Sequence, residues 1–282
     1  MSMIKVFSWN DVLEATENKN HELVLFTHEG SALCVGGFDG PHLGHKELFN
    51  KVFDYKSKNQ KVKAGVITFN FPPRASKNPN DFLGELSSVN LKLEYFQEIG
   101  FDYVVLIDFS CDFSKIKGRD FLAFLKNSCS MQFLVAGSDF RCGYKLDTGI
   151  PQISEFASQY GISFNVVADC LFEDFRISST IIRKFVQNGE LEKASKLLGR
   201  PYALDVENAM YNVNEETSQL QIANSSITQV LPPVGKYKVK VTLADTSTFF
   251  SVMYVESNLL SLEIPLGQKF QKLKKIKFDY KE

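Results

Sequence analysis

The spacing of hydrophobic residues differs between the first two thirds of the chain and the remainder. From about residue 31 to 200, short apolar runs alternate with segments in which apolar side chains recur every three or four positions. The runs predict buried strands, and the spaced segments predict helices with one buried face. We expect strands at 32–35, 62–69, 103–107, 133–136 and 164–167, and helices at 43–55, 86–99, 118–125, 150–160, 179–188 and 191–198.

Strands that alternate with helices predict a parallel sheet with right-handed crossovers, which is a Rossmann-like α/β fold. Past Pro201, short strands separated by proline and glycine are expected at 202–211, 219–223, 237–243, 249–255 and 274–278. We therefore expect an α/β domain over residues 1–200 and a small all-β domain over residues 201–282. The pattern assigns no role to the first 30 residues.

Composition and charge exclude several classes of protein. Hydrophobic residues make up 44% of the 282 residues, which is enough to bury a core. The net charge of -1 provides no strong field to attract nucleic acid or an anionic membrane. Five scattered cysteines contain no C-x-x-C pair, so we expect reduced thiols rather than disulfides or a zinc site. With neither a leader-like N-terminus nor a long apolar stretch, the sequence predicts a soluble, cytoplasmic protein.

A glycine- and histidine-rich string runs from Gly36 to His45, where the first of these strands ends and a helix begins. Ligands of open parallel sheets bind at the carboxyl ends of the strands. Glycines let the backbone approach a phosphate, and a helix N-terminus offers free N–H groups and a positive dipole. His42 and His45 lie on one face of the first helical turn, where both can donate to phosphate oxygens. The string predicts a phosphate site; a solvated glycine-rich turn is the alternative.

A second string, residues 176–183, precedes and opens a later helix. Ser178 or Ser179 is a suitable N-cap, since its hydroxyl would accept from a backbone N–H. Arg176 and Arg183 would then flank the N-terminus of the helix, and two guanidiniums suit the β- and γ-phosphates of a nucleotide. The alternative is a capped surface helix with two ordinary arginines.

The two strings together resemble the bacterial riboflavin kinase/FAD synthetase family, specifically its FMN adenylyltransferase domain, a relative of the HIGH-motif nucleotidyltransferases. The resemblance runs from about residue 31 to 202. Four further stretches support it, at 68–74, at 86–92 with 102–105, at 137–143, and at the interdomain hinge 198–202. The family commonly carries an acidic residue where Asn70 stands, a histidine at Pro72 and a phenylalanine at Cys142.

The resemblance implies that the FMN phosphate attacks the α-phosphorus of ATP, giving FAD and pyrophosphate, with Mg²⁺ held mainly by substrate oxygens. It implies small-molecule substrates, no nucleic acid and no membrane partner, and leaves the oligomeric state open. The expected catalytic residues are His42, His45, Arg176 and Arg183; those that bind ATP are Gly36, Phe38, Asp39, Gly40, Gly44, Ser178, Ser179 and Thr180; those beside the flavin are Asn70, Pro73, Arg74, Asp139 and Arg141.

Past residue 200 the resemblance weakens. The family's kinase half is a β-barrel with a G-F-P-T-A-N signature and a catalytic glutamate. Here Asn224 is retained, but Ile222 replaces the threonine and offers no hydroxyl to a metal or phosphate. Glu256 is the candidate base. We expect a divergent barrel with little or no riboflavin kinase activity; a bifunctional enzyme is the alternative.

Two other functions compete with FAD synthesis. Because the histidine motif binds phosphates rather than flavin, a nucleotidyltransferase with another acceptor is possible on sequence grounds. A non-catalytic flavin-binding or assembly protein is the second, although flavin binding alone needs neither the histidine pair nor two arginines beside a helix N-terminus.

Overall fold

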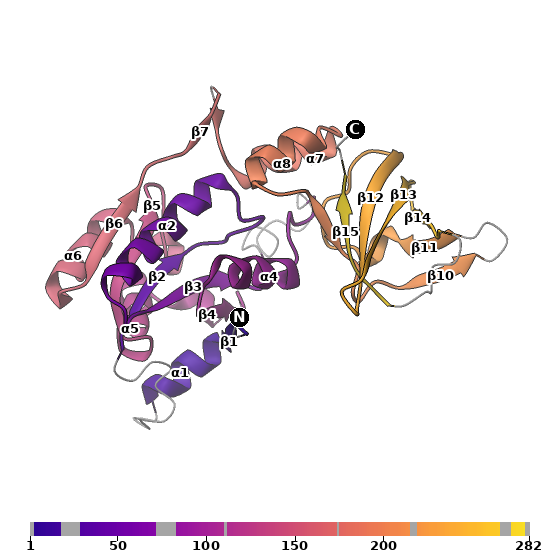
Figure 1. Cartoon of the computed structure of the whole chain (residues 1–282). Helices are drawn as coiled ribbons and strands as arrows, with labels where there is room; N and C mark the ends of the chain where they lie inside the picture. The colour runs from indigo at the N-terminus through magenta and orange to yellow at the C-terminus, as the bar shows by residue number, and fades with distance from the viewer. Residues whose placement is uncertain are drawn as a thin grey trace. The chain divides into compact units, whose positions relative to one another are not determined.

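The structure is a computed structural model (Figure 1). It describes residues 3–17, 29–71, 83–109, 112–173, 175–214, 219–265 and 272–279. Two of the predicted flavin residues, Pro73 and Arg74, lie outside these ranges.

The chain forms two compact units. Unit 1 comprises Met1–Phe38, Gly44–Phe82 and Leu93–Leu171, and unit 2 comprises Asp39–Leu43, Leu83–Lys92 and Phe172–Glu282. Two short stretches from the first third of the chain therefore pack with its C-terminal part. The domain boundary at residue 200 stays a prediction.

Unit 1 contains a six-stranded, all-parallel sheet in the order β1-β4-β3-β2-β5-β6. Its strands are β1 (Lys5–Ser8), β2 (Ser31–Val35), β3 (Lys63–Phe69), β4 (Tyr103–Ile107), β5 (Met131–Gly137) and β6 (Ser163–Val167). The predicted parallel α/β sheet is confirmed. The N-terminal residues contribute β1, which pairs in parallel with β4.

Helices cover both faces of this sheet. One face packs against α1 (Trp9–Glu17), α5 (Gly118–Ser128) and α6 (Ile150–Tyr160), and the other against α2 (Leu43–Lys58) and α4 (Val89–Ile99). Side chains alternate between the two cores along each strand, as in β2, where Leu33 belongs to the first core and Cys34 to the second. The short 3₁₀ helices η2 (Phe113–Lys115) and η3 (Tyr144–Leu146) lie in connections of this unit.

The order of the strands places a switch point beside β2. From β2 the chain proceeds to β3 and β4 on one side, then returns to β5 and β6 on the other. In open parallel sheets, ligands bind at the carboxyl edge where the strand order reverses. The loop that starts at Gly36 leaves β2 at this edge, and the loops after β5 and β3 flank it.

Unit 2 combines a helical pair with an antiparallel sheet. The chain enters it through β7 (Leu171–Phe172) and β8 (Phe175–Arg176), followed by α7 (Ser179–Gln187) and α8 (Leu191–Leu198). A seven-stranded sheet follows, in the order β10-β11-β14-β13-β12-β15-β9. Its strands are β9 (Ala203–Asp205), β10 (Tyr211–Asn214), β11 (Gln219–Ala223), β12 (Gly235–Leu243), β13 (Thr248–Val255), β14 (Leu259–Glu263) and β15 (Leu273–Phe278), with η4 (Asn224–Ser226) after β11. The predicted all-β C-terminal part is confirmed.

Some predicted boundaries were wrong. The strand expected at 202–211 ends at Asp205, because the Asp205 carboxylate accepts from the Glu207 N–H and turns the chain. The helix expected from residue 86 begins at Val89, with the Ser88 hydroxyl accepting from the Leu91 N–H as its cap. We had not predicted β14 as a strand of its own. Every helix in the described ranges is too short or too polar to span a bilayer.

Candidate functional site

The histidine loop, residues 36–42, follows β2, and hydrogen bonds to β3 hold its backbone. The Gly36 N–H donates to the Ile67 carbonyl oxygen at 3.1 Å, and the Thr68 hydroxyl donates to the Gly37 carbonyl oxygen at 3.1 Å. A Cβ at Gly36 would come within 2.9 Å of the Phe38 ring, whereas a Cβ at Gly37 would meet no atom of the described residues within 4 Å. The backbone at Gly37 is therefore open to a close-approaching ligand.

Phe38 anchors the loop in the core of unit 1. It is buried with a φ of 42° and packs edge-to-face on Phe49 and on His45, whose ring centroid is 5.0 Å away. His45 is the third residue of α2 and is partly exposed. Phe38 thus supports the His45 ring.

Asp39 joins the two sequence motifs inside unit 2. Its Oδ2 forms an ion pair with Arg183 Nη2 at 2.5 Å, and its Oδ1 accepts from the N–H groups of Leu86 and Ser87 at 2.8 and 3.3 Å. Its carbonyl oxygen accepts from the Ser179 hydroxyl at 2.7 Å. Burial raises the pKa of Asp39, and the Arg183 guanidinium opposes that shift. The histidine loop and the N-terminus of α7, more than a hundred residues apart in sequence, therefore lie in contact.

The next two residues fix the path of the loop. Gly40 has a φ of 58°, and a Cβ there would lie 2.6 Å from the Leu86 Cβ, so only glycine fits. The Pro41 carbonyl oxygen accepts from Arg200 Nη1 at 2.5 Å, and the same nitrogen donates to the Leu198 carbonyl oxygen. Arg200 therefore ties the loop to the end of α8.

His42 is only 5% exposed, and its electrostatic surroundings are positive. Burial, then the charges of Arg200 and Arg176, lower the pKa of His42 to about 4. The imidazole is neutral at physiological pH and has one N–H to donate. Leu43 then starts α2, with Gly44 as its second residue. His42 and His45 thus stand on either side of the start of the helix.

The second motif forms the N-terminus of α7. The Ser178 hydroxyl accepts from the Ile181 N–H at 3.3 Å, which confirms Ser178 as the cap. Arg176 and Thr180 are exposed. Arg183 is held by the protein, since its Nε donates to the Gly84 carbonyl oxygen at 3.0 Å and its Nη2 pairs with Asp39.

The described flavin candidates follow the two strands that flank β2. Asn70 comes after β3, and its N–H donates to the Ile107 carbonyl oxygen at 2.9 Å. Asp139 and Arg141 come after β5 and are exposed, with Arg141 Nε donating to the Leu146 carbonyl oxygen. All three belong to loops at the carboxyl edge of the sheet. Their contact with flavin stays a prediction.

The two residues predicted as a kinase remnant lie together in unit 2. Asn224 Nδ2 donates to the Glu256 carbonyl oxygen at 2.9 Å, and the Glu256 carboxylate accepts from the Ser261 hydroxyl at 2.9 Å. Asn224 Oδ1 is buried and has no hydrogen-bond partner among the described residues. Ile222 is fully buried in the core of the sheet.

Four residues of the site region were not predicted from the sequence: Thr68, Glu85, Lys92 and Arg200. Thr68 and Arg200 hold carbonyl oxygens of the histidine loop. Both residues lie in stretches that resemble the family, at 68–74 and 198–202, and this resemblance could have marked them as site residues. Glu85 and Lys92 are buried charges beside Asp39. Only the tertiary structure shows their burial.

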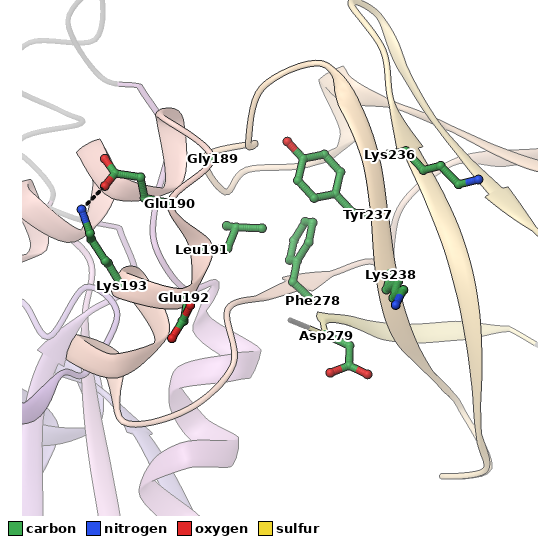
Figure 2. A pocket seen from close by; sticks show the side chains of 10 residues that line it. All are labelled: Gly189, Glu190, Leu191, Glu192, Lys193, Lys236, Tyr237, Lys238, Phe278 and Asp279. Atoms are coloured by element: carbon green, nitrogen blue, oxygen red, sulfur yellow. Dashed lines mark hydrogen bonds and ion pairs between the residues drawn. The ribbon is translucent and has the colours of Figure 1, made fainter. Parts of the chain in front are cut away.

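One pocket of unit 2 lies apart from these motifs (Figure 2). It has a volume of about 450 Å³ and lies where the turn between α7 and α8 faces β12 and the end of β15; it is lined by Gly189, Glu190, Leu191, Glu192, Lys193, Lys236, Tyr237, Lys238, Phe278 and Asp279. None of the predicted site residues lines it. Within the described part of the chain, no three histidine, cysteine or acidic side chains gather as metal ligands.

Comparison with known proteins agrees with the motifs. The bifunctional riboflavin kinase/FMN adenylyltransferase of Buchnera aphidicola subsp. Schizaphis graminum is 29% identical over 231 residues, covering 81% of this chain and 72% of the relative. The Escherichia coli K12 protein of the same name is 27% identical over 78% of this chain and 71% of its own length.

Among solved structures, a Streptococcus pneumoniae protein described as a macrolide-efflux protein has the same fold, with a TM-score of 0.78 and 20% identity over 98% of this chain and 90% of that one. Residues 26–181, more than half of the chain, match the model of the FAD synthetase family; this range contains the string from Gly36 to His45 and residues 176–181 of the second string. The chain therefore belongs to the FAD synthetase family, as the motifs had indicated.

Proposed function

We propose that this protein transfers AMP from ATP to FMN, giving FAD and pyrophosphate. The contact between the histidine loop and the N-terminus of α7, made by the Ser179 hydroxyl and the Asp39 carbonyl oxygen, is the observation that carries the proposal. It brings together the two groups of donors that we propose bind phosphate, one in the histidine loop and one at the N-terminus of α7. Membership of the FAD synthetase family supports the choice of flavin as acceptor.

The proposed reaction needs no side-chain nucleophile. An oxygen of the FMN phosphate attacks the α-phosphorus of ATP, and the bond from that phosphorus to the β-phosphate oxygen breaks, so pyrophosphate leaves with the electron pair. The protein aligns the two phosphates and stabilises the negative charge that moves to the leaving group. Neutral His42 and partly exposed His45 each donate an N–H to a phosphate oxygen. The open backbone at Gly37 lets the phosphates approach the chain closely.

The arginines take different parts in this proposal. Arg176 is exposed and close enough to His42 to lower its pKa, so it is placed to receive the leaving pyrophosphate. Thr180, in the first turn of α7, adds a hydroxyl. Arg183 instead holds Asp39, and through it the loop.

Any Mg²⁺ at this site would be coordinated mainly by phosphate oxygens and water. Both oxygens of Asp39, the one carboxylate of the histidine loop, already have protein partners. Mg²⁺ would supply charge neutralisation on the phosphates. We further propose that Asn70, Asp139 and Arg141 border the flavin, with Pro73 and Arg74, and that the enzyme works in the cytoplasm on small molecules alone.

A second candidate activity is riboflavin phosphorylation. The meeting of Asn224 with Glu256, and the bifunctional relatives, favour it. The buried Ile222 opposes it, because no hydroxyl reaches a metal or phosphate from that position. We propose that adenylylation is the main activity and that phosphorylation is weak or absent.

The test is to incubate the purified protein with ATP, Mg²⁺ and either FMN or riboflavin, and to separate the flavins by chromatography. We expect FMN to be converted to FAD and riboflavin to give little FMN. A folded protein that makes no FAD from FMN, or that adenylylates another phosphate acceptor faster, would overturn the proposal.

A further inference from the structure

The histidine loop rests on a buried cluster of charges that the proposed reaction does not use directly. Two acids, Asp39 and Glu85, and two bases, Lys92 and Arg183, lie together in unit 2. Glu85 is 2% exposed and Lys92 1% exposed. Burying charges disfavours folding unless their partners compensate fully. A cluster of this kind beside a ligand loop therefore calls for a functional explanation.

The main chain around Glu85 is held by the all-β part of unit 2. The Glu85 N–H donates to the Thr228 carbonyl oxygen at 3.0 Å, and the Glu85 carbonyl oxygen accepts from the Val230 N–H at 2.9 Å. A Cβ at Gly84 would lie 2.8 Å from the Val230 nitrogen, so the two segments are in close contact. The Tyr202 hydroxyl donates to the Val230 carbonyl oxygen at 2.7 Å.

The side chain of Glu85, in contrast, is incompletely satisfied. Its Oε2 is buried without a hydrogen-bond partner among the described residues. The charged groups that act on it are Asp39, which disfavours its ionised form, and Lys92 and Arg183, which favour it. Tyr202 is also within electrostatic reach of Glu85. Burial, followed by the charge of Asp39, raises the pKa of Glu85 to about 7.

A short chain of contacts connects Glu85 to the histidine loop. The next residue, Leu86, donates its N–H to Asp39 and packs against Gly40, while Gly84 accepts from Arg183. Residues 84–87 thus pack directly against the histidine loop. His42 follows Gly40 by two residues in the same loop.

We propose that Glu85 is a positioning residue whose protonation sets the charge behind the histidine loop and so tunes the binding of ATP there. With Glu85 ionised, Asp39, Glu85, Lys92 and Arg183 sum to zero charge; with Glu85 neutral, the cluster carries one positive charge. A positive charge behind the loop favours a triphosphate, so ATP binding and proton uptake by Glu85 are linked. This inference rests on the proposed function, since it takes the loop to bind ATP.

The test compares Glu85→Gln with Glu98→Gln, an exposed glutamate of α4, because glutamine imitates neutral Glu85 at every pH. The ratio of kcat/KM for ATP between variant and wild type cancels the titration of the substrates. For Glu85→Gln we expect a ratio near one at about pH 6, rising about fivefold by about pH 8.5. For Glu98→Gln we expect no change with pH. A ratio for Glu85→Gln that is flat, or falls, would overturn the inference.

Calorimetry of ATP binding in buffers of different ionisation enthalpy keeps the test independent of turnover and of the variant's folding. Near pH 7.5, wild type should take up a fraction of a proton more than Glu85→Gln. If the variant does not fold, wild type alone should show net uptake that disappears by about pH 9, as Glu85 stays ionised. Equal uptake at both pH values would refute the inference. ATP binding with proton uptake but without FAD formation would refute the proposed function and leave the inference standing.

Discussion

Glu85 and His42 should give the folding stability opposite dependences on pH. The pKa of Glu85 is raised from 4.5 to about 7, so the folded state binds this proton more tightly than the unfolded state. The contribution of Glu85 to the free energy of unfolding is largest at low pH and is lost as pH rises to about 7. The pKa of His42 is lowered from 6.5 to about 4, so its contribution is present above pH 6.5 and lost as pH falls. The two effects oppose each other over the same range.

The magnitudes follow from the shifts. A difference of one in pKa corresponds to about 1.4 kcal/mol, so the change from 4.5 to about 7 for Glu85, or from 6.5 to about 4 for His42, corresponds to about 3 kcal/mol when fully expressed. Between about pH 5 and pH 8, Glu85 should lower the free energy of unfolding by about 2–3 kcal/mol and His42 should raise it by about 2 kcal/mol. Both side chains are at least 95% buried, so solvent screens the two effects only weakly. In the wild type the two nearly cancel.

Single substitutions separate the two effects. Relative to wild type, Glu85→Gln should become more stable by about 2–3 kcal/mol as pH rises from about 5 to 8, while His42→Asn should lose about 2 kcal/mol over the same range. Urea unfolding followed by circular dichroism at several pH values measures both. Parallel curves for Glu85→Gln and wild type would refute the burial of an ionisable Glu85.

Three further substitutions or substrates test the site. His45→Ala should reduce turnover from FMN by about 10²-fold or more, because a preorganised donor is lost, with little change in thermal stability; near-normal FAD formation would contradict its role. Gly40→Ala should destabilise the protein by at least about 1–2 kcal/mol, from its φ of 58° and the contact with Leu86. Its urea midpoint should be lower than that of Gly161→Ala, where φ is similar, 67°, but a Cβ meets no atom of the described residues within 4 Å. With riboflavin as the only flavin, product should form far more slowly than with FMN; comparable rates would restore the bifunctional alternative, and Glu256→Gln should then abolish phosphorylation alone.

The parts of the fold that were predictable from sequence are those set by local spacing. The apolar run of β4 was located to the residue, because a fully buried strand needs an uninterrupted run. The helix α8 was located equally well, with Gly199 at its C-terminus in the left-handed conformation. Where a tertiary contact competes with the local pattern, the prediction shifted, as at the start of α4, where Leu86 and Ser87 donate to Asp39 instead of joining the helix.

The candidate site was predictable only in its motifs. The strings containing His42 and Ser179 were recognised separately, and neither string alone shows the hydrogen bond between the Ser179 hydroxyl and the Asp39 carbonyl oxygen. The engagement of Arg183 by Asp39 could not be read from spacing, because a guanidinium near a helix N-terminus suits a phosphate and a carboxylate equally well. The burial of Glu85 could not be predicted from its neighbours in sequence, because it depends on a distant segment, residues 228–230.

The central claim is that the α-phosphate of ATP moves to FMN, and ATP labelled at individual phosphates tests it most directly. With ATP labelled at the α-phosphorus, FMN and Mg²⁺, we expect label to appear in FAD in step with FAD formation, and about 10²-fold or more slowly for His45→Ala. With ATP labelled at the γ-phosphorus, the label should appear in pyrophosphate only. Label from the γ-position in flavin, or a folded wild-type protein that leaves all α-label in ATP, would contradict the account.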